Sequence, residues 1–196
     1  MAVTALASCS NDDVVDVNNG GGISFRASLD RAVTRTNVTS LQNLAAFNVT
    51  AIGDGKNYFT DLGVSSADNG VNWTTASTYY WPGYELAFFA YAPQAPAGTV
   101  SIDNASKKIT GFSPAQAVAD QKDLVISYNT GTKAVNEGPG VAMNFKHALS
   151  QIEVKAKCSN DKIKIEIMGV KLVNAAAKAE FAFPETETKS SYVLQQ

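Results

Sequence analysis

The chain has 196 residues, 45% of them hydrophobic and 17% charged, and 16 Lys and Arg against 18 Asp and Glu leave a formal net charge of −2. This length fits one globular domain, or one domain with a tail. The near-neutral charge excludes nucleic acid as a partner, because sequence-independent binding requires a basic surface. One His and two Cys exclude a conventional zinc site, and a His-based triad would depend on His147 alone. The composition therefore predicts no catalytic residues, no metal and no cofactor.

Residues 1–9 are typical of the end of a bacterial signal peptide, in which a short apolar run is followed by small residues and a Cys. Leu6-Ala7-Ser8-Cys9 resembles a lipobox, after which the signal is cut and the Cys is acylated. We predict Cys9 as the lipidation site, with its lipid as the only attachment to a membrane; an incidental thiol in a chain terminus is the alternative. Since only residues 2–7 precede the box as an apolar run, we expect the precursor to begin upstream.

Residues 10–22 lack hydrophobic periodicity and end in Gly20-Gly21-Gly22. Such a composition predicts a flexible tether between the membrane and the fold. We therefore place the folded domain over residues 23–196.

From residue 23 onward the dominant hydrophobic period is two, which predicts strands. In the clearest case Ile163, Ile165 and Ile167 alternate with charged residues. One buried face and one wet face are typical of antiparallel sheets. The predicted strands cover residues 23–27, 47–51, 86–91, 141–145, 152–156 and 163–167, with turn signals between them at positions such as Gly53-Asp54-Gly55 and Asp68-Asn69-Gly70. Many short strands, with either one helical turn or a loop at 113–116, predict an all-β sandwich or barrel.

Three single residues need interpretation. His147 lies between two alternating runs, and we interpret it as a structural residue that satisfies a backbone group at a strand end. Cys158 has no partner for a disulfide framework, and we expect a free and buried thiol. Trp73 follows a turn in a polar stretch, so it is the aromatic residue that we least expect in the core.

Two stretches of the sequence carry a family resemblance. The first is residues 79–93, YYWPGYELAFFAYAP, and the second runs from Gln121 to Ile152 and includes MNFKHALSQI. Together they resemble the fimbrillin family of Bacteroidetes, whose members are major, minor and anchor subunits of donor-strand pili. The acidic residues after Cys9 are similar to the export signal of surface lipoproteins in these bacteria.

The resemblance implies an antiparallel, transthyretin-like β-sandwich with Greek-key-type connections and little helix. It also implies a non-enzymatic subunit or anchor on the outer membrane, which supports adhesion and assembles with other fimbrial subunits by donor-strand exchange. The resemblance also implies a second β-sandwich after the first and a C-terminal segment that supplies the donor strand, whereas this chain stops at Gln196. We therefore expect either a truncated product or a short member of the family.

In polymerising fimbrillins an arginine-specific protease removes the first strand. All three Arg of this chain, Arg26, Arg31 and Arg35, lie within ten residues of one another. The segment around Arg31 and Arg35 is polar enough to form an exposed loop after a first strand, so these two residues are the predicted processing sites. A chance cluster on a solvated segment is the alternative.

A second function is left open by the aromatic residues. Six of them could form a platform for sugar rings of a host glycan, or they could belong to the core: Trp73, Tyr79, Tyr80, Trp81, Tyr84 and Tyr91. The alternative function is therefore a glycan-binding surface lipoprotein that uses exposed aromatics, with Trp73 as the possible ligand residue.

Overall fold

The computed structural model describes residues 21–29, 44–150 and, except for positions 151, 153, 161, 172, 175 and 177, residues 152–183. These residues form an all-β fold, as the period-two pattern predicts, with two sheets and very little helix. The strands are β1 (Phe25–Leu29), β2 (Ala46–Gly53), β3 (Lys56–Ser65), β4 (Thr74–Thr75), β5 (Leu86–Ala92), β6 (Thr99–Ile102), β7 (Lys107–Phe112), β8 (Val125–Gly131), β9 (Val141–His147) and β10 (Ala179–Ala182).

The larger sheet has the order β1-β9-β8-β5-β2-β3-β4, and the smaller sheet has the order β10-β7-β6. All pairings are antiparallel except that of β1 with β9, which is parallel. This one parallel pair departs from the antiparallel expectation. A parallel neighbour requires a long crossover, and here the first strand pairs with a strand more than a hundred residues further along the chain.

The two ends of the larger sheet approach each other. Gly22, just before β1, forms an antiparallel bridge with Tyr80, which follows β4, and the Ile23 N–H donates to the Tyr79 carbonyl at 2.7 Å. The Tyr58 hydroxyl donates to the Tyr80 carbonyl and holds the same segment. The sheet therefore curls around one core, and the start of β1 lies at its seam.

The central strands are buried on both faces. On the inner face Phe47, Phe88 and Phe145 belong to the first core, and on the outer face Phe89 and Ile126 pack against the small sheet in a second core. Asn48 and Thr50 of β2 are consequently buried, although the alternation predicted a wet face there. Asp61 of β3 contacts both residues, since its carbonyl accepts from the Asn48 amide and its N–H donates to the Thr50 hydroxyl, and the pattern of β2 alone does not reveal these contacts.

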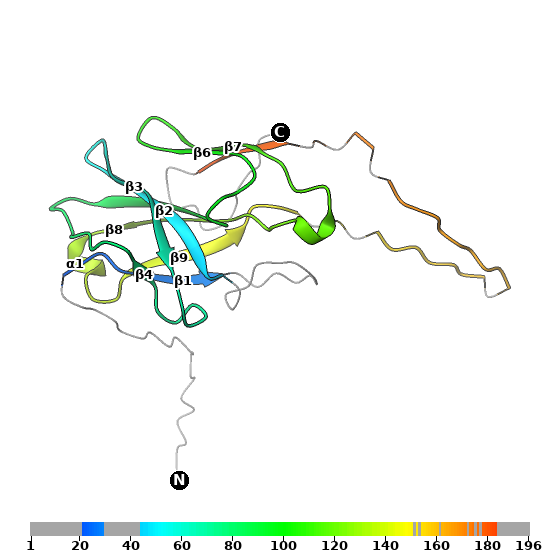
Figure 1. Cartoon of the computed structure of the whole chain (residues 1–196), viewed down its shortest axis with the longest axis horizontal. Helices are drawn as coiled ribbons and strands as arrows, with labels where there is room; N and C mark the ends of the chain where they lie inside the picture. The colour runs from blue at the N-terminus through cyan, green and yellow to red at the C-terminus, as the bar shows by residue number, and fades with distance from the viewer. Residues whose placement is uncertain are drawn as a thin grey trace, which may run out of the picture.

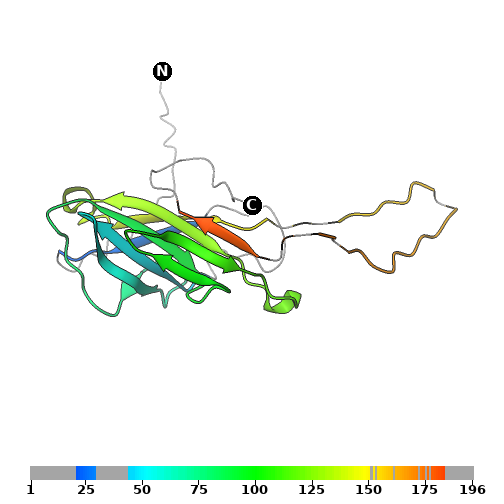
Figure 2. The ribbon, with the colours of Figure 1, turned by 90° about the horizontal axis from the view of Figure 1, so that it is seen from above.

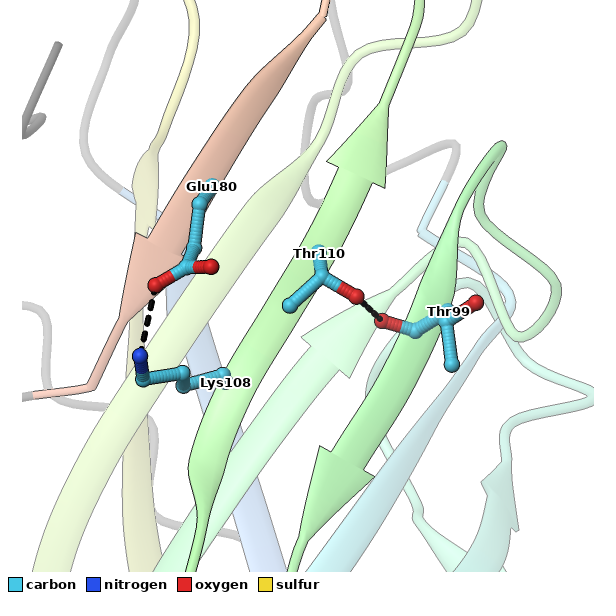
Figure 3. A network of polar contacts seen from close by, with 4 residues as sticks. All are labelled: Thr99, Lys108, Thr110 and Glu180. Carbon is cyan, nitrogen blue, oxygen red and sulfur yellow. Dashed lines mark hydrogen bonds and ion pairs between the residues drawn. The ribbon is translucent and has the colours of Figure 1, made fainter.

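The small sheet is joined by side chains as well as by its ladders (Figure 3). Lys108 of β7 and Glu180 of β10 form an ion pair at 2.7 Å, and the Thr110 hydroxyl donates to the Thr99 carbonyl of β6 at 3.4 Å. Ile109 and Phe181 point to the other face of this sheet and are buried against the second core. Polar side chains thus bridge the solvent face while apolar ones anchor the sheet to the sandwich.

The predicted strands at 152–156 and 163–167 are wrong. The described residues between 152 and 178 form no strand, and this segment, here called the arm, extends away from the sandwich (Figures 1 and 2). Its apolar side chains are exposed: Ile152, Val154, Ile163, Ile165, Ile167, Met168, Val170 and Val173. The alternation is that of a strand, but none of the strands in the described part of the chain pairs with the arm.

Of the two interpretations of residues 113–116, the loop is correct, and a 3-10 helix lies just after it at Val118–Asp120. A four-residue helix, α1 (Lys133–Asn136), connects β8 to β9, where no helix was predicted. Such a short helix has no room for an amphipathic repeat, so periodicity does not detect it.

Candidate functional site

The first strand and the surface beneath it form the candidate site. Along β1 the side chains alternate, with Phe25 buried, Ala27 and Leu29 half-buried, and Arg26 and Ser28 exposed. We call the surface that β1 covers the β1 seat; it consists of β9, the Tyr79–Tyr80 backbone and the core rings Phe47 and Phe88. At the seat, β1 forms the edge of the larger sheet and adds Phe25 to the first core.

The backbone of β1 is held mainly from one side. Five residues of β1 pair in parallel register with β9, from Phe25 opposite Val141 to Leu29 opposite Phe145. The Val141 N–H donates to the Ser24 carbonyl at 2.8 Å, and only the start of the strand is also bonded on its other side, to Tyr79. Among the described strands β1 is the edge strand of the larger sheet, and edge strands can be exchanged for another strand more readily than central ones.

Phe25 is the main side-chain anchor of β1. Its ring meets Phe47 edge-on, with centroids 6.1 Å apart and planes at 87°, and meets Phe88 in the same way at 5.9 Å and 84°. It is only 7% exposed. Such T-shaped pairs are favourable by about 0.5–1.5 kcal/mol beyond the burial of their area, so this ring contributes both burial and two aromatic contacts to the seating of β1.

Beside the ring, a close backbone approach and one polar contact shape the seat. Gly140 has φ +75°, and a Cβ there would lie 3.0 Å from Ser24 Oγ and 3.2 Å from the Ser24 carbonyl oxygen. A side chain at Gly140 would therefore push the strand away. On the solvent side the Ser28 hydroxyl donates to Asn144 Oδ1 at 2.6 Å.

His147 is the last residue of β9 and lies two residues beyond Phe145, the last partner of β1. Its Nδ1 lies 2.5 Å from Asp123 Oδ2, with side chains 18% and 12% exposed, and the Ala148 N–H donates to the Leu124 carbonyl at 2.8 Å. His147 thus lies at a strand end, as predicted, and one of its partners is a carboxylate 24 residues upstream. Because His147 and Asp123 are 24 residues apart, the sequence pattern around either residue does not reveal their contact.

The structure places the predicted site residues as follows. Cys9, Arg31 and Arg35 lie outside the described residues. The expectation that Trp73 is exposed is wrong, because its ring packs against Phe47 at 5.0 Å and only 9% of the residue is exposed. Cys158 is free, as predicted, but exposed rather than buried, because it lies on the arm.

Of the aromatic residues that could bind a sugar, most belong to the core. Trp73, Trp81 and Tyr91 are buried and Tyr79 is half-buried, whereas Tyr80 is 62% and Tyr84 41% exposed. Trp73, Trp81 and Tyr91 are therefore core residues rather than parts of an exposed aromatic platform.

Sequence reasoning missed two polar clusters. Asp68 accepts hydrogen bonds from the Ser66 hydroxyl at 2.7 Å and from the Asn72 N–H at 2.8 Å, and these bonds lower its pKa to about 2. The Tyr91 hydroxyl donates to Asp61 Oδ1 at 2.6 Å, and its pKa is raised, first by burial and then by that carboxylate. The Asp68-Asn69-Gly70 turn is a sequence signal for the first cluster. The second cluster joins β3 and β5, which lie on either side of β2, so it depends on the strand pairing.

Neither cluster has the composition of a catalytic or metal centre. No group of three or more His, Cys, Asp or Glu that could hold a metal occurs within the described ranges. The helices in this part of the chain are also too short and too polar to cross a bilayer.

The chain was compared with known proteins. A family model described as fimbrillin-like matches residues 31–193. A comparison with curated proteins gave no match. Among solved structures, a fimbrial protein from Bacteroides ovatus is similar with a TM-score of 0.40 and 16% identity, over 65% of this chain and 28% of that one. This chain thus spans less than a third of the length of that protein.

Proposed function

Because the chain belongs to the fimbrillin-like family, we propose that it is a non-enzymatic subunit or anchor of a fimbria on the outer membrane, which assembles with other subunits by donor-strand exchange. In this proposal Cys9 carries the lipid anchor, and the assembled fimbria supports adhesion. The proposal leaves open whether the subunit belongs to the shaft, the tip or the base.

The single observation that carries the proposal is the β1 seat. An N-terminal edge strand completes the main core with an alternating apolar row, and it precedes the segment that contains Arg31 and Arg35. A cut after either residue would separate β1 from β2 and leave β1 held by non-covalent contacts alone. Its departure would uncover Phe47, Phe88 and β9.

The physical consequence of such a cut favours association. An exposed seat would present apolar rings and the unpaired backbone groups of β9, both of which are costly in water. A strand from a neighbouring subunit would cover the same area and restore the same ladder, which is strand addition to a sheet edge. Assembly would therefore be driven by the interactions that β1 makes within one chain.

The test is limited digestion of the full chain with an Arg-specific protease, followed by N-terminal sequencing and a denaturing gel without heating. We expect cleavage after Arg31 or Arg35 and detergent-resistant oligomers. The double variant Arg31→Lys, Arg35→Lys is the matched control, because it keeps the charge and removes both sites. Cut protein that stays monomeric would contradict strand exchange for this chain.

The exposure of Tyr80 and Tyr84 favours a second candidate, binding of a glycan. Exposed aromatic rings can stack on the faces of sugar rings. Trp73 no longer contributes to this candidate, because it is buried. A glycan array with the wild type and with Tyr80→Ala, Tyr84→Ala tests it: specific binding that disappears in the variant supports the module, and the absence of binding by the wild type contradicts it.

A further inference from the structure

We propose that the β1 seat selects its occupant: an extended segment of another subunit that runs parallel to β9 and places an aromatic ring where Phe25 lies. This inference rests on the proposed function, because it names the strand that donor-strand exchange would bring in. It follows from what holds β1 in place in the single chain.

The aromatic requirement comes from the shape of the site under Phe25. Phe47 and Phe88 both present themselves to that ring edge-on, at 6.1 and 5.9 Å, and both are fully buried. A shorter aliphatic side chain would leave a cavity between the two rings and lose both T-shaped contacts. The neighbouring inward positions, Ala27 and Leu29, are only half-buried, so they discriminate less.

The direction comes from the backbone. The parallel register places residue 25 opposite Val141 and residue 29 opposite Phe145. At the entrance, Gly140 lies against Ser24 while the Val141 N–H donates to the Ser24 carbonyl. A strand of opposite direction would present a different set of donors and acceptors to β9 and would not reproduce this pattern.

The arm of the same chain illustrates what the seat would reject. Ile152, Val154 and Ala156 repeat the spacing of Ile23, Phe25 and Ala27, and Ile152 and Val154 are 67% and 58% exposed. The arm therefore has the alternating pattern of β1, but Val154 stands at the position that corresponds to Phe25. The absence of an aromatic ring would keep the arms of neighbouring copies out of the seat.

The experiment measures the entry of labelled peptides into the full chain after cleavage. The chain is cut after Arg31 or Arg35, or at an engineered site for a second protease between these positions where the wild type resists, and the protease is then inactivated. The parent peptide covers residues 21–30 with a dye at its end, and it carries Lys in place of Arg26 so that residual protease leaves it intact. Fluorescence anisotropy and gel filtration report the bound fraction.

Four further peptides discriminate between the outcomes: Phe25→Leu, Phe25→Ala, the parent sequence reversed, and the arm segment 150–158. We expect the parent to bind, Phe25→Leu to bind about tenfold more weakly, and Phe25→Ala about a thousandfold more weakly, in line with the free energies of large-to-small core changes. The reversed and arm peptides should bind at least as weakly as Phe25→Leu.

Each alternative result has one meaning. If the parent and the Phe25→Ala peptide bind equally well, the aromatic requirement is overturned while strand exchange stands. If the reversed peptide binds as well as the parent and a label at its N-terminus lies beside Phe145, the requirement for direction is overturned, whereas a label beside Val141 supports it. If the cleaved chain admits no peptide at all, the proposed function itself fails, and this inference fails with it.

Discussion

At the scale of single residues, the Asp68 loop shows how hydrogen bonds set a charge. The carboxylate accepts bonds from Ser66 and Asn72, and these bonds favour the ionised form. The loop positions Trp73, which follows Asn72 directly and enters the core. A small polar turn therefore sets where a large apolar ring enters the sandwich.

This loop yields a prediction about pH. Because the pKa of Asp68 is lowered from 3.8 to about 2 by folding, the carboxylate contributes stability that is full above pH 3.8 and disappears as the pH falls through about 2. Relative to Asp68→Asn, the wild type should thus have its full advantage in melting temperature near neutral pH and lose it between about pH 4 and 2. Thermal unfolding of both proteins across that range is the measurement. An advantage that is independent of pH would show that the charge is not responsible.

The environments of Trp73 and His147 could not be read from their sequence neighbours. Trp73 follows a polar turn and was expected outside, yet it packs on Phe47 because the chain turns inward after Asn72. His147 contacts Asp123, a carboxylate 24 residues upstream that its sequence neighbours do not reveal. Local composition describes neighbours along the chain, and both outcomes depend on neighbours in space.

At the scale of elements, β1 contributes more to the core than its edge position suggests. Phe25 is buried between two rings, whereas Arg26 beside it is exposed. We expect Phe25→Ala to lower the free energy of unfolding by about 3–5 kcal/mol, and Arg26→Ala to change it by less than about 0.5 kcal/mol. Urea denaturation of the two variants is the measurement. Similar small effects in both would mean that β1 is not seated on the core.

Unlike β1, the arm should contribute little to stability. Its Ile165 is 62% exposed, whereas Ile109, on the inner face of the small sheet, is fully buried. Ile109→Ala should therefore cost about 2–5 kcal/mol, and Ile165→Ala less than about 0.5 kcal/mol. Denaturant titrations of the full chain compare them directly. A large loss for Ile165→Ala would show that the arm packs against the sandwich in solution.

At the scale of the whole molecule, the two cores share one set of strands. β5 pairs with β2 on one side and with β8 on the other, and both of its faces are buried, one in each core. β6 in contrast is the outer strand of the small sheet. The most stable part of the fold should therefore be its middle layer.

Hydrogen exchange measures this order of stability. The amides of β5 should exchange most slowly among the described strands, because their opening disrupts both cores. The amides of β6 should exchange many times faster, since one side of that strand has no partner in its sheet. Equal protection in the two strands would contradict the assignment of β5 as the shared centre.

The sequence by itself determined the all-β class, the strands around β2, β5 and β9, the turn at Gly53-Asp54-Gly55 and the likeness to fimbrillins, because these depend on local alternation, local turn chemistry and recognisable motifs. Only the tertiary structure decided that β1 pairs in parallel with β9, that the polar face of β2 is covered, and that the well-patterned arm has no partner strand. Alternation states that a segment is suited to a sheet. Which strand lies beside it, and whether any does, depends on contacts between residues far apart in the chain.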